Sequence, residues 1–401
     1  MTKGKDIYIF NPENDLALAY GLEGYTAPPR AQMLRRDLQL LPIWYCRDNA
    51  AILVGNNDNT QWLEEANSTF GISTSTILPN KLQCESHQYH PWGWNLDLRR
   101  RLINECVPEN DLPSTTYIKR LRELSHRRIT ISVHRSLIEK TGEKFCQIPV
   151  EVNSVKDIKA FELSHPKCFI KAPWSGSGRG IYRVLDADAR CFETWAQGII
   201  NRQGSIMCEQ ALDKTLDFAM EFECANKEAS FKGYSVFFND SHCSFDRCIS
   251  ASDEYLEKYI KSRVENPGLI DIVKNALAET LTKLIAPNYE GMLGVDMMLY
   301  NDNDGNVKIN PCVELNLRMT MGIVASAIGS RILAPGSAGH FRISYHKSPN
   351  DCNKMAAKLL KDNPSCVENG KLASGFLPLV PVNDTSNYCA YIIAGKNDCS
   401  F

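Results

Sequence analysis

Residues 294–319, GVDMMLYNDNDGNVKINPCVELNLRM, contain the feature that most limits how this chain folds, because two apolar runs flank a polar turn. Such a pattern predicts a β-hairpin. If the turn is centred on Gly305, Asp296 lies opposite Glu314 in the antiparallel ladder. The alternation of side chains along a strand places three polar residues of the second run on one face: Glu314, Asn316 and Arg318. The hairpin is therefore expected to bring two carboxylates and an amide together at one end.

Oxygen atoms of this kind are the ligands that Mg²⁺ prefers, usually one or two carboxylates together with substrate phosphates. We therefore predict a magnesium site formed by Asp296, Glu314 and Asn316. A half-buried hairpin with a polar outer face is the alternative interpretation. The turn itself does not fit a calcium-binding EF-hand, because Tyr300 and Pro311 occupy positions that require acids.

A glycine-rich loop follows a short apolar strand, residues 169–171, which ends in Lys171. Glycines allow backbone N–H groups to approach phosphate oxygens, and a lysine on the preceding strand adds a positive charge. A plain connecting turn is the alternative interpretation of this loop. The Walker A motif, the protein-kinase motifs and the dinucleotide-binding fingerprint do not fit its spacing.

A third segment, residues 205–222, reads as an apolar strand that ends in Glu209 and Gln210 and leads into another strand. A lysine strand, a glycine loop, a strand-end glutamate and a hairpin ending in Glu-x-Asn-x-Arg follow one another in this order. This arrangement resembles the ATP-grasp superfamily over roughly residues 120 to 330. The resemblance implies ATP and Mg²⁺ as cofactors.

The resemblance also implies a role for individual residues. It implies contacts with the phosphates of ATP for Lys171 and for a lid loop that includes Ser175, Gly176, Ser177, Gly178 and Gly180. It implies a hinge beside adenine at Glu209, Gln210 and Leu212, and a ribose contact at Asp217. It assigns Mg²⁺ to Asp296, Glu314 and Asn316, and places Arg318 near the transferred phosphate or the carboxylate substrate.

Two arginine assignments stay open. Arg247 is a candidate for a phosphate or substrate contact, with an ordinary surface arginine as the alternative. Members of the superfamily usually carry a further nucleotide-binding lysine near the start of the lid, where this chain has Arg127 and Arg128. An arginine contacts phosphate through a bidentate fork and is not equivalent to a lysine. We assign this role to Arg128, with solvated helix residues as the alternative for both.

The predicted fold class is α/β (α+β), with the ATP-grasp fold preceded by an N-terminal α/β domain. We expect this N-terminal, substrate-side domain at residues 1–115, a lid subdomain at 116–203, and a large subdomain with a C-terminal extension at 204–401. A chain of 401 residues is too long for one compact core, which fits two or three subdomains.

Local patterns place further elements. Expected strands lie at residues 6–10, 51–55, 146–152, 340–345, 376–382 and 388–394, and expected helices at 96–104, 155–163, 253–283 with a break at 266–268, 322–335 and 350–361. Asp15 follows the first strand, where open α/β sheets bind ligands, and it is equally suited to cap a helix. For His87 and His90 we favour packing or substrate stacking over metal binding.

Composition indicates an ordinary cytoplasmic enzyme. The net charge of −2 gives no sign of binding to nucleic acid or anionic membrane. The 15 cysteines are scattered without a C-x-x-C pair, so reduced thiols are the simplest interpretation. The first residues lack the apolar core of a signal peptide.

These observations predict an ATP-dependent ligase that joins a carboxylate to an amine, or to a thiol, through an acylphosphate. Its expected partners are small-molecule carboxylate and amine substrates. A kinase with the same nucleotide fold and a non-catalytic nucleotide-binding regulatory protein are the alternatives.

Overall fold

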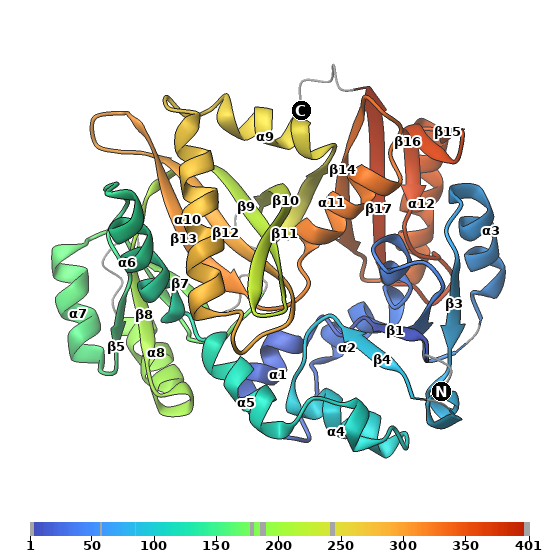
Figure 1. Cartoon of the computed structure of the whole chain (residues 1–401), viewed down its shortest axis with the longest axis horizontal. Helices are drawn as coiled ribbons and strands as arrows, with labels where there is room; N and C mark the ends of the chain where they lie inside the picture. Colours follow the sequence, from blue (N-terminus) through green and yellow to red (C-terminus); the bar gives the residue numbers. More distant parts are fainter. Residues whose placement is uncertain are drawn as a thin grey trace. The chain divides into compact units, whose positions relative to one another are not determined.

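The computed structural model describes residues 4–56, 58–84, 86–176, 180–184, 190–240 and 245–396. The chain divides into two compact units (Figure 1). Unit 1 comprises residues 1–119, 246–256 and 318–401, and unit 2 comprises residues 120–245 and 257–317. Two helices cross the boundaries between units along the chain: α5 (Thr115–Leu124) and α9 (Asp253–Lys261).

The N-terminal part of unit 1 is a parallel sheet in the order β3-β2-β1-β4. Its strands are β1 (Asp6–Ile9), β2 (Ala50–Leu53), β3 (Thr74–Ile77) and β4 (Gln88–Pro91). Its helices are α1 (Asn14–Tyr20), α2 (Pro29–Asp37), α3 (Thr60–Phe70) and α4 (Leu96–Asn104), with 3-10 turns at Leu41–Trp44, Pro79–Cys84 and Glu109–Asp111. Apolar residues of β1, β4 and α4, including Ile7, Tyr89 and Leu98, form its core. The α/β character expected for this region is confirmed.

The C-terminal part of unit 1 is antiparallel. Its strands follow the order β11-β14-β17-β16-β15. They are β11 (Phe245–Ser250), β14 (Ser337–Tyr345), β17 (Tyr388–Lys396), β16 (Lys371–Pro378) and β15 (Cys366–Glu368). The helices of this part are α11 (Met321–Arg331) and α12 (Pro349–Asp362). The expected closing hairpin is present, since Phe376 of β16 pairs with Ile393 of β17.

Unit 2 contains a small sheet in the order β5-β8-β6-β7. Its elements are β5 (Val150–Val152), β6 (Cys168–Lys171), β7 (Ile181–Val184), β8 (Ile206–Gln210), α7 (Val155–Ser164) and α8 (Arg190–Gln203). Ile158, Ile170 and Phe192 belong to its hydrophobic core. The strand expected at residues 146–152 is shorter than predicted, because only its last three residues pair with β8.

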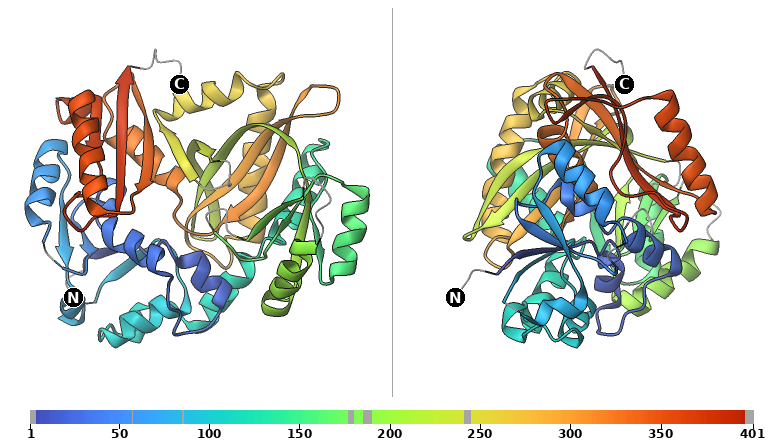
Figure 2. Two further views of the ribbon diagram at one scale, coloured as in Figure 1. Left: turned by 180° about the vertical axis from the view of Figure 1, so that it is seen from behind. Right: turned by 90° about the vertical axis from the view of Figure 1, so that its right-hand side faces the viewer.

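The larger sheet of unit 2 is antiparallel, in the order β13-β12-β9-β10. Its strands are β9 (Asp213–Ala225), β10 (Glu228–Asn239), β12 (Gly291–Asn301) and β13 (Val307–Asn316). The helices α6 (Ile129–Thr141) and α10 (Gly268–Leu284) pack against each other and against this sheet, as Figures 1 and 2 show. The interruption expected at Asn266–Gly268 separates α9 from α10. An α/β fold with a mixed architecture is thus confirmed.

The hairpin formed by β12 and β13 has the predicted pairing at its functional end. Asp296 lies opposite Glu314, as expected. Closer to the turn, however, Met298 pairs with Asn310, so the register shifts by two residues between the two positions. Pro311 lies within this irregular stretch, where a strand residue without an N–H group is tolerated. The turn centre assumed at Gly305 is wrong, because the pairs next to the turn, such as Asn301 with Val307, are centred on Asp304. Asp296 lies opposite Glu314 because of the register shift.

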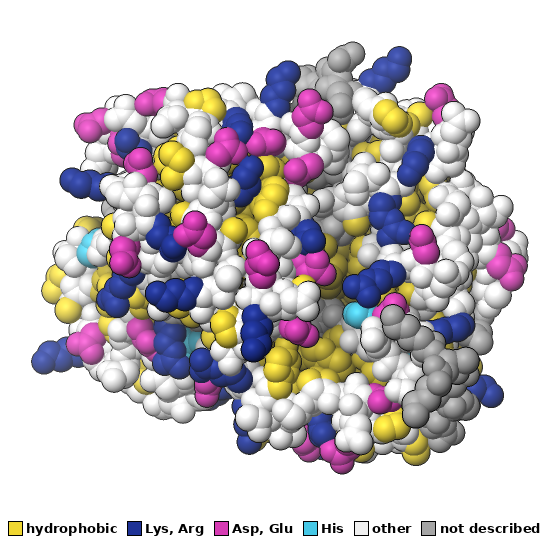
Figure 3. Space-filling view, viewed as in Figure 1, with side chains coloured by type: hydrophobic (Ala, Val, Ile, Leu, Met, Phe, Trp, Pro, Cys, Tyr) yellow, Lys and Arg dark blue, Asp and Glu magenta, His cyan; other side chains and the backbone are white. Residues whose placement is uncertain are grey.

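The surface fits the balanced composition. On the face drawn in Figure 3, acidic and basic side chains are interspersed among scattered hydrophobic ones. Within the described residues, no helix combines the length and the hydropathy needed to cross a membrane.

Candidate active site

The glycine-rich loop joins β6 to β7 in unit 2. Lys171, the last residue of β6, pairs with Ile181, and the N–H of Ala172 donates to the carbonyl of Gly180 over 2.7 Å. Gly180 has a φ of 73°, and a Cβ atom there would lie 2.8 Å from the Cβ of Ser175. The base of the loop therefore requires a glycine at this position for both backbone conformation and space. Gly176 lies on the described part of the loop, whereas the predicted phosphate contacts Ser177 and Gly178 lie outside the described residues.

Lys171 is buried at the end of β6, an interior strand of the small sheet, where it forms an ion pair with Glu209 of β8. Its Nζ donates to Oε2 of Glu209 over 2.5 Å, and the two side chains are only 9% and 12% exposed. A buried lysine is stable as a cation only with such a partner. The structure therefore unites the predicted phosphate-binding lysine with the predicted hinge glutamate.

Asp217, the predicted ribose contact, lies on β9 near the same lysine. Its Oδ2 accepts hydrogen bonds from Lys214 at 2.5 Å and from Asn239 at 3.2 Å. Burial raises the pKa of Asp217, while the charges of Lys214 and Lys171 act in the opposite direction. Two further hinge candidates precede it in the chain: Gln210, exposed at the end of β8, and Leu212, half-buried in the connection to β9.

The three predicted magnesium ligands lie at the end of β12 and β13. Asp296 and Glu314 are paired across the ladder, and the amide Nδ2 of Asn316 donates to Oδ2 of Asp296 over 3.0 Å. Glu314 is 26% exposed, and only its Oε1 accepts a hydrogen bond from a described residue. These are hard oxygen donors, so the set fits Mg²⁺ bound together with phosphate oxygens. Among the described residues, no group of three His, Cys, Asp or Glu side chains is suited to hold a metal without such help.

Arg127 connects the loop to these ligands. Its Nη1 donates to the carbonyl of Ala172 and to Oγ of Ser175, both over 2.6 Å. Its Nη2 donates to Oε1 of Glu314 over 2.8 Å. The side chain is 4% exposed, so this guanidinium is a buried bridge between the base of the loop and the predicted metal ligand Glu314.

Arg128, which the sequence analysis assigned to nucleotide binding, has a different environment. Its side chain is 51% exposed, and its Nη1 lies 3.5 Å from Oε1 of Glu151. Together with Arg120, Glu123 and Ser132, it lines a cavity of about 390 Å³ along α5 and α6. Of the two arginines, the structure therefore brings Arg127, not Arg128, to the predicted magnesium ligands.

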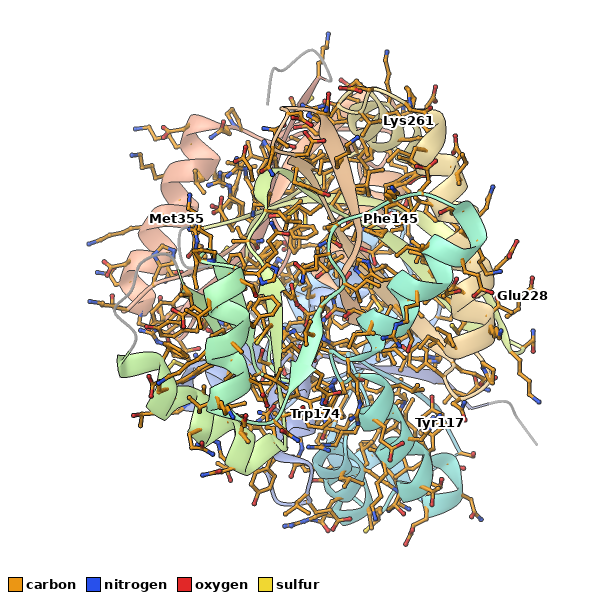
Figure 4. All side chains as sticks on the ribbon, turned by 90° about the vertical axis from the view of Figure 1, so that its left-hand side faces the viewer. Tyr117, Phe145, Trp174, Glu228, Lys261 and Met355 are labelled. Atoms are coloured by element: carbon orange, nitrogen blue, oxygen red, sulfur yellow. The ribbon has the colours of Figure 1, made fainter. Side chains whose placement is uncertain are left out.

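Two aromatic rings fix the beginning of the loop. The indole of Trp174 donates to the carbonyl of Arg122 over 2.8 Å, and the Arg122 guanidinium lies 3.7 Å from the indole centroid. The ring of His126 meets Trp174 edge-on at 4.6 Å, and Trp174 is labelled in Figure 4. The Nδ1 atom of His126 accepts from the backbone N–H of Arg128, so the ring proton is carried by Nε2. Sequence reasoning missed His126 and Trp174, because their roles depend on contacts between distant segments.

Two cysteines, the buried Cys312 and the half-buried Cys146, lie near several of the predicted site residues. Burial raises the pKa of Cys312 well above its usual value, with further contributions from the charges of Asp296, Glu209 and Glu314. Burial likewise raises the pKa of Cys146 to about 12, with Glu209 adding to the effect and Lys171 opposing it. Lys171, the predicted hinge glutamate and the predicted metal ligands Asp296 and Glu314 therefore act on the same two cysteines of unit 2.

Arg318 and Arg247 belong to unit 1. Arg318 forms a bidentate ion pair with Asp15, with distances of 2.7 Å from Nε to Oδ1 and 2.6 Å from Nη2 to Oδ2. Asp15 does not cap a helix, because Glu13 is the N-cap residue of α1. Arg247 pairs with Asp246 over 2.6 Å and lies opposite Arg342 in the ladder.

The histidines of the aromatic segment before α4 pack as favoured from the sequence. Nε2 of His90 lies 2.6 Å from Oδ1 of Asp6, and its ring stacks on Tyr8 with centroids 4.8 Å apart. His87 is buried, and its ring meets Tyr89 edge-on at 6.2 Å.

Comparison with solved structures identifies the fold. Biotin carboxylase from Campylobacter jejuni aligns with a TM-score of 0.51 at 12% identity, covering 98% of this chain and 87% of that one. The biotin carboxylase domain of 2-oxoglutarate carboxylase from Hydrogenobacter thermophilus gives 0.51 at 12% identity, covering 98% and 86%. N5-carboxyaminoimidazole synthetase from Staphylococcus aureus gives 0.49 at 11% identity, covering 100% and 95%. No family model matches the chain, and no curated protein matches its sequence.

Proposed function

Because the chain has the ATP-grasp fold, as its sequence predicted, we propose that it is an ATP-dependent ligase joining a carboxylate to an amine, or to a thiol, through an acylphosphate. One observation carries this proposal. In unit 2, the Arg127 guanidinium donates to the carbonyl of Ala172, the residue after Lys171 at the base of the glycine loop. The same guanidinium donates to the carboxylate of Glu314. This contact supports the proposal, because phosphoryl transfer requires cationic groups and metal-binding carboxylates close to one another.

Each of these groups has a part in the proposed reaction. A carboxylate is a poor electrophile at neutral pH, and phosphorylation by ATP activates it for attack. Lys171 and Arg127 supply positive charge to phosphate oxygens, and the loop after Ala172 excludes water from the activated acid. Asp296, Glu314 and Asn316 would hold Mg²⁺, which neutralises phosphate charge when bound. No nucleophilic side chain is needed, so the buried cysteines take no part.

The remaining assignments belong to the same proposal. Glu209, Gln210 and Leu212 form the adenine hinge, and Asp217 contacts the ribose. Arg318 meets the transferred phosphate or the acid, and Arg247 is the weaker candidate for such a contact. Only Leu317 separates Arg318 from Asn316 along the chain. The described cysteines are free thiols, which supports a reducing, cytoplasmic location.

A panel of substrates tests the proposal. Release of ADP and of phosphate would be measured with Mg-ATP and a library of amino acids and small dicarboxylates, with amines or thiols as acceptors. Turnover that requires both an acid and an acceptor supports the ligase. A phosphorylated product formed without an acceptor would instead identify a kinase. Nucleotide binding without turnover on any combination would identify a regulatory binder.

A further inference from the structure

The parallel sheet of unit 1 has a topological switch point between β1 and β4. The chain runs from β1 to β2 and β3 on one side, and then returns to β4 on the other side of β1. Open parallel sheets bind ligands in the crevice beyond the carboxyl ends of the strands at such a point. Here the segment after β1 contains Asn11, Glu13 and Asn14, and the segment after β4 leads to Asn95.

This switch point is held rigidly by buried amides. Nδ2 of Asn11 donates to the carbonyl of Gly93 over 2.8 Å, and Nδ2 of Asn95 donates to Oδ1 of Asn14 over 2.9 Å. A Cβ atom at Gly93 would lie 2.4 Å from Nδ2 of Asn14, so only glycine permits this approach. The two segments are therefore held together beside Glu13, which lies four residues after the end of β1.

Glu13 brings two arginines together. Its Oε1 accepts from Nη1 of Arg35 over 2.5 Å and from Nη2 of Arg101 over 3.3 Å. The carboxylate is 3% exposed, and its Oε2 has no hydrogen-bond partner among the described residues. The buried Glu13 carboxylate thereby holds the two guanidinium groups next to each other.

Both arginine side chains are partly exposed, although Nε of Arg101 is buried. The Arg35 and Arg101 side chains are 35% and 38% exposed. Asp97 pairs with Nε of Arg101 over 3.1 Å and balances part of the local charge. Burial and the charge of Arg35 lower the pKa of Arg101, whereas the carboxylates of Glu13 and Asp97 act in the opposite direction. A bound oxyanion would accept charge-assisted hydrogen bonds from the two guanidinium groups.

We propose that Arg35 and Arg101, aligned by Glu13 beyond the carboxyl ends of β1 and β4, form a subsite for an oxyanion of the ligase substrate, a carboxylate or a phosphate. Glu13 is a positioning residue, whereas the two arginines contact the substrate. This inference rests on the proposed function, because it assigns the substrate class of that enzyme.

Chemical modification of the full chain tests the subsite without any variant. Reaction of each arginine with butanedione would be followed by peptide mass spectrometry, with succinate, inorganic phosphate or neutral succinamide added. We expect succinate or phosphate to slow modification of Arg35 and Arg101 saturably, and the more effective anion identifies the head group. Arg100, exposed on the same helix as Arg101, is the internal control and should react at an unchanged rate. If neither succinate nor phosphate changes the rate at which Arg35 and Arg101 are modified, the proposal is overturned.

Kinetics separate this inference from the proposed function. Arg35→Gln and Arg101→Gln should each raise the KM of the anionic substrate about 10- to 100-fold while leaving kcat and the affinity for an ATP analogue unchanged. Glu13→Gln should raise the same KM and speed modification of both arginines, whereas Arg100→Gln should behave as wild type. Turnover with unchanged KM in all three site variants would overturn the subsite alone. Anion protection in a chain that never hydrolyses ATP would overturn only the ligase assignment.

Discussion

At the residue scale, Glu314 is the clearest test of the magnesium site. Glu314→Gln keeps the side-chain shape and an oxygen acceptor for Arg127, but removes the negative charge that Mg²⁺ requires. We expect turnover to fall on the order of 10²- to 10³-fold with the fold unchanged. ADP release and circular dichroism would measure the two effects. Asp304→Asn, in the exposed turn of the same hairpin, is the matched control, and equal activities of the two variants would remove Glu314 from the site.

Lys171 gives a separate prediction about the nucleotide. Lys171→Ala removes a buried cation next to the glycine loop, so affinity for a non-hydrolysable ATP analogue should fall roughly 10- to 100-fold in calorimetry. Lys171→Gln should show the same loss while retaining a donor toward Glu209. Lys159→Ala serves as the control, because the side chain of Lys159 on α7 is half-exposed. Wild-type affinity in both Lys171 variants would remove the phosphate assignment.

The buried ring of His126 leads to a prediction of how the stability of the folded chain depends on pH. Burial, with the charges of Arg128, Arg122 and Arg127, lowers its pKa from 6.5 to about 3, so the folded ring stays neutral. Below pH 6.5 the unfolded chain binds a proton at this histidine that the folded chain does not. The stabilising contribution is therefore complete above pH 6.5 and is lost progressively as the pH falls toward 3, by up to about 1.4 kcal/mol per pH unit.

Chemical denaturation at several pH values would measure this contribution. His126→Asn keeps an acceptor for the backbone N–H of Arg128 but does not titrate in this range. The unfolding free energy of the wild type minus that of the variant should decrease as the pH falls from 6.5 to 4, because only the wild type loses stability through this histidine. A difference that stays constant over this range would contradict the neutral, buried ring.

At the scale of elements, the glycine loop depends on its closure by Gly180. Gly180→Ala combines a positive φ with a close contact to Ser175, whereas Gly204→Ala has a φ of 88° and nothing within 4 Å. We expect Gly204→Ala to lower the unfolding free energy by about 1 kcal/mol and Gly180→Ala by roughly 2 kcal/mol. Only Gly180→Ala should also weaken binding of the ATP analogue. Equal effects of the two variants on both measurements would show that closure of the loop is not important.

Helices and strands were predictable where they depend on the spacing of apolar and polar residues within one segment. Alternating apolar residues and a polar turn located the hairpin, and its register placed Asp296 opposite Glu314. The two-residue shift near Pro311 was not foreseen, because nothing in the local sequence distinguishes an irregular ladder from a regular one. Arg127 was also left unassigned, since its three contacts lie 45 to 187 residues away in the chain. Contacts between residues so far apart in the chain leave no periodic pattern in the sequence.

At the scale of the whole molecule, the sequence indicated the fold but not how the chain divides into compact units. Residues 246–256 and 318–401 join the N-terminal region in unit 1, although they lie far from it in the chain. Charged pairs such as Asp15 with Arg318 connect these segments. Such discontinuous units arise from tertiary packing, which local patterns do not encode.

The central claim is that the groups gathered in unit 2 bind one Mg-ATP. A crystal structure of the full chain with a non-hydrolysable ATP analogue and magnesium tests it most directly. The account predicts the triphosphate against Lys171 and Arg127, with magnesium on Asp296, Glu314 and Asn316. An analogue bound elsewhere, or a metal away from these three side chains, would contradict it.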